Sequence, residues 1–139
     1  DAGSRDIIEV IRAYEKTSPN IRTYRNLPRE EFLGVLRAAA VLLGNSSLGL
    51  LEAPFLKLPT INVGNRQKKR QHAENVVFVP HEKGEIKGAV QRALADTDFR
   101  RRVANCSCPF GDGHVGERIA AKLAETPVDN RLLIKDWGY

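Results

Sequence analysis

The sequence predicts an α/β fold in which a Rossmann-like parallel sheet has helices on both faces. Segments with apolar residues at helical spacing alternate with short continuous apolar runs, which are typical of strands covered on both faces. Helices that alternate with such strands form βαβ units, whose strands run parallel. The 139 residues are enough for one domain with a real core, and we see no linker, so we expect a single domain over residues 1–139.

The helical pattern occurs in five segments. Ser4 can cap the first helix. Pro28 can open the second, with Glu30 and Glu31 near its positive end. The tail, Asn130–Tyr139, has no clear period. The expected helices are Ser4–Tyr14, one that opens at Pro28, Glu85–Leu94, Asp98–Val103 and Val115–Leu123.

Four short runs predict strands. The run Ala39–Leu43 is continuously apolar, which favours a strand buried on both faces. Two later runs, "PTINV" and "VVFV", have the same character. The expected strands are Ile21–Arg25, Ala39–Leu43, Pro59–Val63 and Val76–Val79.

Composition narrows the class of protein. A hydrophobic content of 42% and a charged content of 28% are typical of a soluble globular protein. The net charge of +5 indicates an anionic partner, which could be nucleic acid, a membrane surface or a phosphorylated small molecule. No apolar run approaches the roughly 18 residues of a membrane span, and no signal sequence opens the chain. We therefore expect no membrane association.

The start of the chain and its two cysteines indicate whether the chain is part of a larger protein and in which cellular compartment it works. The chain begins at Asp1 and contains no methionine, so we expect it to be part of a larger protein. Cys106 and Cys108 are too close in sequence for a good disulfide, and no second pair is present to complete a zinc site. Reduced thiols favour the cytoplasm.

The stretch "GNSSLGLLEAP", residues 44–54, has the features of an anion site. Gly44 lies at the carboxyl end of an expected strand, where parallel sheets bind ligands. Asn45, Ser46 and Ser47 would form the turn into a helix, whose first N–H groups and serine hydroxyls can hold a phosphate. Gly49 would keep the first turn open. An ordinary helix cap is the alternative interpretation, because Ser and Asn are preferred at caps in any protein.

Glu52 favours a binding site over a plain cap. It lies too far into the expected helix to help the first N–H groups, and leucines surround it. A carboxylate there needs a partner, either a cation or two hydroxyls such as those of a ribose diol. Pro54 removes a backbone donor, so we expect a kink or an irregular helix start.

A basic cluster, residues 65–72, follows "PTINVG" and should lie at the same sheet edge. It could be a solvated charge run, or it could bind nucleic acid, although aromatic residues are scarce within it. Arg66 opposite a serine-lined helix start is better suited to a diphosphate, which a guanidinium grips in a fork. We therefore expect the two clusters to form one site.

Together, "GNSSLGLLEAP", "LPTINVGNRQKKR", "ENVVFV" and "PFGDGHVGERIA" resemble the C-terminal half of UDP-N-acetylglucosamine 2-epimerases. The resemblance is to the hydrolysing branch of sialic-acid-type sugar synthesis, and it runs from the start of the chain to about Leu123. It implies a glycosyltransferase-B-like protein with two Rossmann-like domains, of which this chain is the UDP-binding C-terminal one. The glycine-rich segment departs from the family: it begins Cys108-Pro109-Phe110 where relatives have Asn-Pro-Tyr.

The resemblance implies a role for each predicted site residue. The serines would hold the diphosphate, Glu52 would accept the ribose hydroxyls, and Arg66 would reach the phosphates. The loop 27–29 would border the uracil ring. The expected UDP-binding residues are Leu27, Arg29, Gly44, Asn45, Ser46, Ser47, Glu52 and Arg66.

The resemblance also implies the reaction. UDP would leave by elimination to give a 2-acetamidoglycal, and water would then add to give N-acetylmannosamine, with no metal or cofactor. The catalytic groups would lie in an N-terminal domain that this chain lacks, and His72, His81 and His114 match no catalytic position. Relatives also act on UDP-linked diacetamido sugars, so either sugar fits. The full-length protein is expected to form a homodimer.

Two other functions fit parts of the sequence. A nucleotide-sugar glycosyltransferase of the same two-domain shape would also use a glutamate for the ribose. A nucleic-acid-binding module would use the basic run Arg66–Arg70, with affinity that falls steeply with salt.

Overall fold

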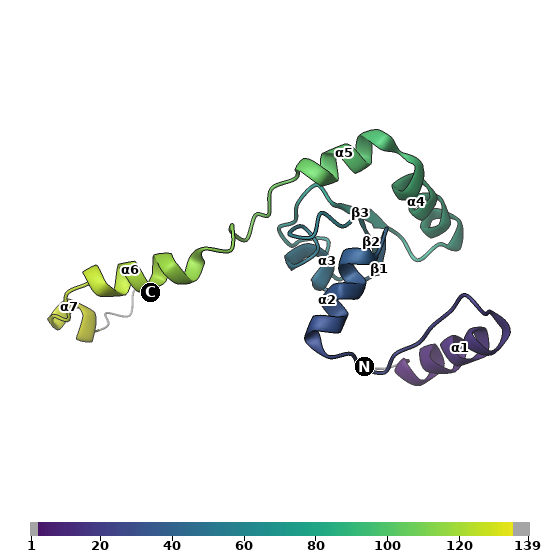
Figure 1. The fold of residues 1–139 in the computed structure, drawn as a ribbon, viewed down its shortest axis with the longest axis horizontal. Coiled ribbons are helices and arrows are strands. Elements are labelled where there is room, and N and C mark those ends of the chain that lie inside the picture. The colour runs from purple at the N-terminus through teal and green to yellow at the C-terminus, as the bar shows by residue number, and fades with distance from the viewer. Residues whose placement is uncertain (1–2, 135–139) are drawn as a thin grey trace. The chain divides into compact units, whose positions relative to one another are not determined.

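The computed structural model describes residues 3–134 of the chain (Figure 1). The chain falls into two compact units, residues 1–38 and residues 39–139. The first unit holds two helices, α1 (Ser4–Thr17) and α2 (Arg29–Ala38). The second unit holds the sheet and the remaining helices. No helix within residues 3–134 combines the length and the apolar character that crossing a membrane requires.

In the first unit, the two expected helices are confirmed, but the expected strand Ile21–Arg25 is wrong. This segment is a loop. The Glu15 carboxylate accepts hydrogen bonds from the backbone N–H and the hydroxyl of Thr23, and the Arg22 side chain donates to the Pro19 carbonyl at 2.7 Å. The polar groups of the loop are therefore used locally, where a strand would need a neighbouring strand to satisfy them.

The second unit contains a parallel sheet of three strands in the order β1 (Leu42–Gly44), β2 (Thr60–Val63) and β3 (Val76–Val79). In the register, β2 pairs Asn62 with Gly44 on one side and with Phe78 on the other. The predicted parallel sheet is confirmed. The segment Ala39–Leu43 was expected to be covered on both faces, but the strand lies slightly later and Leu43 is 51% exposed. Leu43 pairs with Ile61 and so lies on the α4 face of the sheet, where α4 packs mainly against β2 and β3.

One face of the sheet carries the apolar core. Ile61 and Val79 pack with residues of α4 (Lys83–Ala95) and α5 (Thr97–Asn105). The Asp96 carboxylate caps α5 by accepting from the N–H groups of Asp98 and Phe99, both at 2.9 Å. The core consists of Ile61, Val79, Ala89, Ala93, Phe99 and Val103.

The other face of β2 carries the short helix α3 (Leu48–Leu51). A Cβ atom on Gly49 would lie 2.5 Å from Cγ2 of Thr60, so the helix backbone rests directly on the strand. The buried Asn75 amide donates to the carbonyls of Gly49 and Leu58, each at 3.1 Å, and to the Thr60 hydroxyl at 3.3 Å. Helices therefore cover both faces, as predicted, because alternate residues of β2 point to opposite sides.

Two helices follow α5. The helix α6 (Val115–Glu125) confirms the expected helix Val115–Leu123, and none of its residues is buried. The tail, which has no clear period in the sequence, contains the short helix α7 (Asn130–Leu133). The rest of the tail, residues 135–139, lies outside the described residues.

Candidate functional site

The loop between β1 and α3 carries the serines of the predicted site. Gly44 ends β1, and α3 begins at Leu48. Ser47 is the N-cap of α3 and makes no side-chain capping bond, whereas the hydroxyl of Ser46, one residue earlier, accepts a hydrogen bond from the Leu48 N–H at 3.3 Å. This bond does not prevent ligand binding, because a hydroxyl that accepts one hydrogen bond can still donate its own proton to a phosphate oxygen.

The helix behind this loop is shorter than the sequence suggested. α3 has four residues, and Glu52 follows it as the C-cap. Residues 52–57 form successive turns, in which the N–H of Lys57 donates to the carbonyl of Pro54 at 3.2 Å. The helix thus ends before Pro54 and does not kink at it. One turn has little macrodipole, so any anion held here would depend on individual N–H and hydroxyl donors.

Glu52 is half-buried at the end of α3, and its backbone N–H donates to the Leu48 carbonyl at 3.0 Å. The next two residues, Ala53 and Pro54, are buried. The ribose contact of Glu52 stays a prediction.

The second predicted cluster follows β2 in the same unit. Arg66, Lys68 and the two next basic residues are exposed, whereas Gln67 between them is only 3% exposed. The Gln67 side-chain amide donates to the Asn45 carbonyl at 3.1 Å. The structure therefore brings the serine loop and the Arg66 loop into direct contact, as the shared sheet edge predicted.

Three buried amides near these loops were missed by the sequence analysis. Asn62 is fully buried, and neither polar atom of its side chain has a partner among the described residues. The side-chain oxygens of Gln67 and Asn75 are also buried without a partner there. A polar residue inside the apolar run "PTINV" was the signal that could have identified Asn62.

A pocket of about 440 Å³ opens at the carboxyl ends of β2 and β3. Gly64 has a φ of +81°, where other residues are strained, and a Cβ atom there would collide with the His81 imidazole and displace that ring. His72 meets the ring of Phe78 edge-on, with ring centroids 5.0 Å apart. The pocket is lined by Gly64, Asn65, Lys68, Phe78, Val79, Pro80 and His81.

Leu27 and Arg29, the residues predicted to border uracil, belong to the first unit. They lie in a pocket of about 550 Å³ within that unit, which Phe32 and Val35 also line. Their place beside the base stays a prediction.

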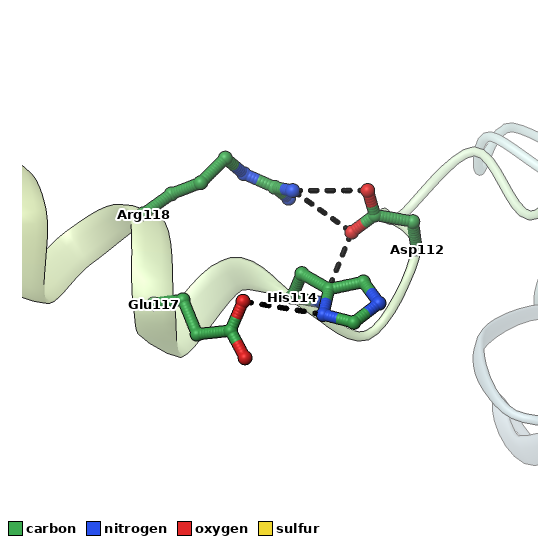
Figure 2. A network of polar contacts seen from close by, with 4 residues as sticks. All are labelled: Asp112, His114, Glu117 and Arg118. Atoms are coloured by element: carbon green, nitrogen blue, oxygen red, sulfur yellow. Dashed lines mark hydrogen bonds and ion pairs between the residues drawn. The ribbon is translucent and has the colours of Figure 1, made fainter.

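The glycine-rich loop is ordered by a polar network (Figure 2). Both Asp112 carboxylate oxygens accept from the Arg118 guanidinium at 2.9 Å, and one also accepts from the His114 N–H at 3.0 Å. These bonds hold the pKa of Asp112 below its ordinary value. The backbone N–H of His114 has the largest effect, and the Arg118 side chain has the next largest. The His114 ring lies 3.3 Å from the Glu117 carboxylate.

The two cysteines are free thiols. Cys106 is buried, and the burial raises the pKa of its thiol above the ordinary value. Cys108 is half-buried. No group of His, Cys, Asp or Glu within residues 3–134 is arranged to hold a metal ion.

Comparison with a solved structure identifies the fold. The fold matches a crystal structure of UDP-N-acetylglucosamine 2-epimerase with a TM-score of 0.72 and 20% sequence identity, over 84% of this chain and 32% of that one. The chain thus has the Rossmann-like α/β fold of glycosyltransferase-B-like proteins, as the sequence predicted.

The family follows from the sequence comparison. The family model for UDP-N-acetylglucosamine 2-epimerase matches residues 1–124, and the chain belongs to this family.

Curated relatives carry related names. The chain is 35% identical over 139 residues to UDP-N,N'-diacetylbacillosamine 2-epimerase (hydrolyzing) of Legionella pneumophila, covering 100% of this chain and 35% of the relative. It is 32% identical over 127 residues to UDP-N-acetylglucosamine 2-epimerase of Neisseria meningitidis, covering 91% and 32%. It is 36% identical over 110 residues to polysialic acid biosynthesis protein P7 of Escherichia coli, covering 79% and 28%. The chain spans about a third of the length of these relatives.

Proposed function

We propose that this chain is the UDP-binding part of a UDP-N-acetylglucosamine 2-epimerase of the hydrolysing type. The observation that carries the proposal is the hydrogen bond from Gln67 to the Asn45 carbonyl, which joins the serine loop to the Arg66 loop. Because the chain belongs to the UDP-N-acetylglucosamine 2-epimerase family, we infer that the ligand of these two loops is a UDP-sugar.

The diphosphate would lie between these two loops. Ser46 and Ser47 would donate hydroxyl and backbone hydrogen bonds to it, and the exposed Arg66 guanidinium would neutralise part of its charge. Gly44 and Asn45 would let the phosphates approach the backbone. Glu52 would accept the ribose hydroxyls, and Leu27 with Arg29 would border the base.

The sugar would be UDP-N-acetylglucosamine or a UDP-linked diacetamido sugar, since relatives named for each type match the chain. The groups that act on the sugar would belong to a part of the protein outside these 139 residues. Loss of UDP by elimination, followed by addition of water to the 2-acetamidoglycal, would give N-acetylmannosamine from the first substrate. The chain alone would then bind UDP without turnover. A cytoplasmic location and a homodimer stay predictions.

A pair of arginine variants tests the proposal. Arg66→Ala removes the guanidinium expected on the diphosphate, whereas Arg70→Ala removes the side chain of another exposed arginine from the same basic run. We expect calorimetry to show UDP affinity about tenfold or more weaker for Arg66→Ala and nearly unchanged for Arg70→Ala, since charged hydrogen bonds contribute about 1.5–3 kcal/mol. Equal losses for both variants would indicate nonspecific charge attraction and would contradict the proposed site.

A further inference from the structure

Gln67 connects the two loops at the positions next to their predicted ligand contacts. Gln67 follows Arg66 directly, and its bonded partner Asn45 directly precedes Ser46. The hydrogen bond spans 22 residues of sequence. Gln67 is also 3% exposed, so its side chain lies beneath the loops and out of reach of a large ligand.

The bond fixes the direction of a specific donor. The carbonyl of Asn45 and the N–H of Ser46 belong to one peptide unit, which is planar and trans, so the two groups point in opposite directions. When the carbonyl is held by Gln67 below the loop, the Ser46 N–H points away from Gln67. A carbonyl that accepts a hydrogen bond also polarises its peptide, which strengthens the N–H as a donor.

Gln67 is poorly suited to a purely stabilising role. Its side-chain oxygen is buried without a partner among the described residues, and an unpaired buried acceptor is unfavourable. An apolar side chain of similar size would avoid that penalty. The amide of Gln67 therefore contributes loop orientation more than stability.

We propose that Gln67 is a positioning residue that aims the Ser46 N–H at the diphosphate and holds the serine loop in register with Arg66. This inference rests on the proposed function, because the diphosphate is the ligand of that site. Gln67 does not touch the ligand. It acts through the Asn45–Ser46 peptide.

Gln67→Met tests the inference, because Met keeps the length of the side chain and removes the amide. Gln91→Met, at an exposed glutamine of α4 outside the two loops, is the matched control. We expect UDP affinity to fall about three- to tenfold for Gln67→Met, because one hydrogen bond corresponds to a factor of this size. Uridine affinity should stay unchanged. The melting temperature should move by less than about 4 °C. Gln91→Met should match the wild type in all three measurements.

A second measurement separates this inference from the proposed function. In the absence of ligand, the amide resonances of Ser46 and Ser47 should shift in Gln67→Met only. If the wild type does not bind UDP, the proposed function fails, but these amides still report whether Gln67 holds the loop. Unchanged amides at Ser46 and Ser47 would overturn the inference. So would a large loss of stability with equal losses of UDP and uridine affinity, since that pattern belongs to a structural residue.

Discussion

The contact between α3 and β2 gives a sharp test of how the serine loop is supported. In Gly49→Ala, the new Cβ atom would lie 2.5 Å from Cγ2 of Thr60, well inside van der Waals contact. Overpacking of this kind costs about 1–3 kcal/mol. The better helix propensity of Ala offsets at most about 1 kcal/mol in a full helix, and less in a single turn. We therefore expect the free energy of unfolding to fall by about 1–2 kcal/mol.

A second substitution at Thr60 should relieve the collision in Gly49→Ala. Thr60→Ser removes Cγ2 and keeps the hydroxyl that accepts from Asn75. Thr60→Ser alone should cost about 1 kcal/mol for one buried methyl group. In the double variant, the alanine methyl should fill the space that Cγ2 leaves, so the two losses should not add.

Urea unfolding of the wild type, the two single variants and the double variant measures this coupling. We expect a coupling free energy of at least about 1 kcal/mol in favour of the double variant. Gly84→Ala in α4 is the control, because a Cβ atom there meets nothing within 4 Å, and it should be neutral or slightly stabilising. A stable Gly49→Ala variant, or strictly additive losses, would refute the close packing of α3 on β2.

Three further predictions concern other parts of the chain. Asn75→Ala should lower the free energy of unfolding by about 2–4 kcal/mol, because the buried Gly49 carbonyl and Thr60 hydroxyl oxygen lose a donor and the Leu58 carbonyl keeps the Thr60 hydroxyl, and urea unfolding would reveal it. The pKa of Asp112 is depressed in the folded chain. The ionised Asp112 carboxylate therefore stabilises the fold fully above the ordinary carboxyl pKa, and this stabilisation is lost as pH falls through the pKa that Asp112 has in the folded chain. A carboxyl NMR titration of Asp112 with its midpoint at or above about 3.9 would contradict this. Iodoacetamide should alkylate Cys108 well before Cys106, whose thiol is buried with a raised pKa, and mass spectrometry of the peptides would report the order.

The sequence predicted the sheet well because its strands are short apolar runs with little competing pattern. Val76–Val79 has the predicted bounds. The strand expected at Pro59–Val63 begins one residue later, at Thr60, because Pro59 has no N–H to donate to the ladder. Ile21–Arg25 has β-branched residues too, but its polar groups bond to α1 and to its own loop. The composition of Ile21–Arg25 alone could not reveal that this segment lacks a neighbouring strand in the described residues.

The site was predictable in outline only. Two loops at the carboxyl edge of a parallel sheet must come close, and the sequence placed Ser46 and Arg66 on those loops. The bond that joins the loops runs from Gln67 to a backbone carbonyl 22 residues away, and no local pattern reveals such a partner. Within a run of charged residues, Gln67 looked like one more exposed side chain. Its burial became visible only in the folded chain.

The most direct test of the central claim is a UDP titration of the chain followed by amide chemical shifts. We expect saturable shifts centred on Ser46, Ser47 and Arg66, with a second group at Glu52, and little change in α5. Shifts absent from these residues at millimolar UDP, or spread evenly over exposed lysines and arginines, would contradict it.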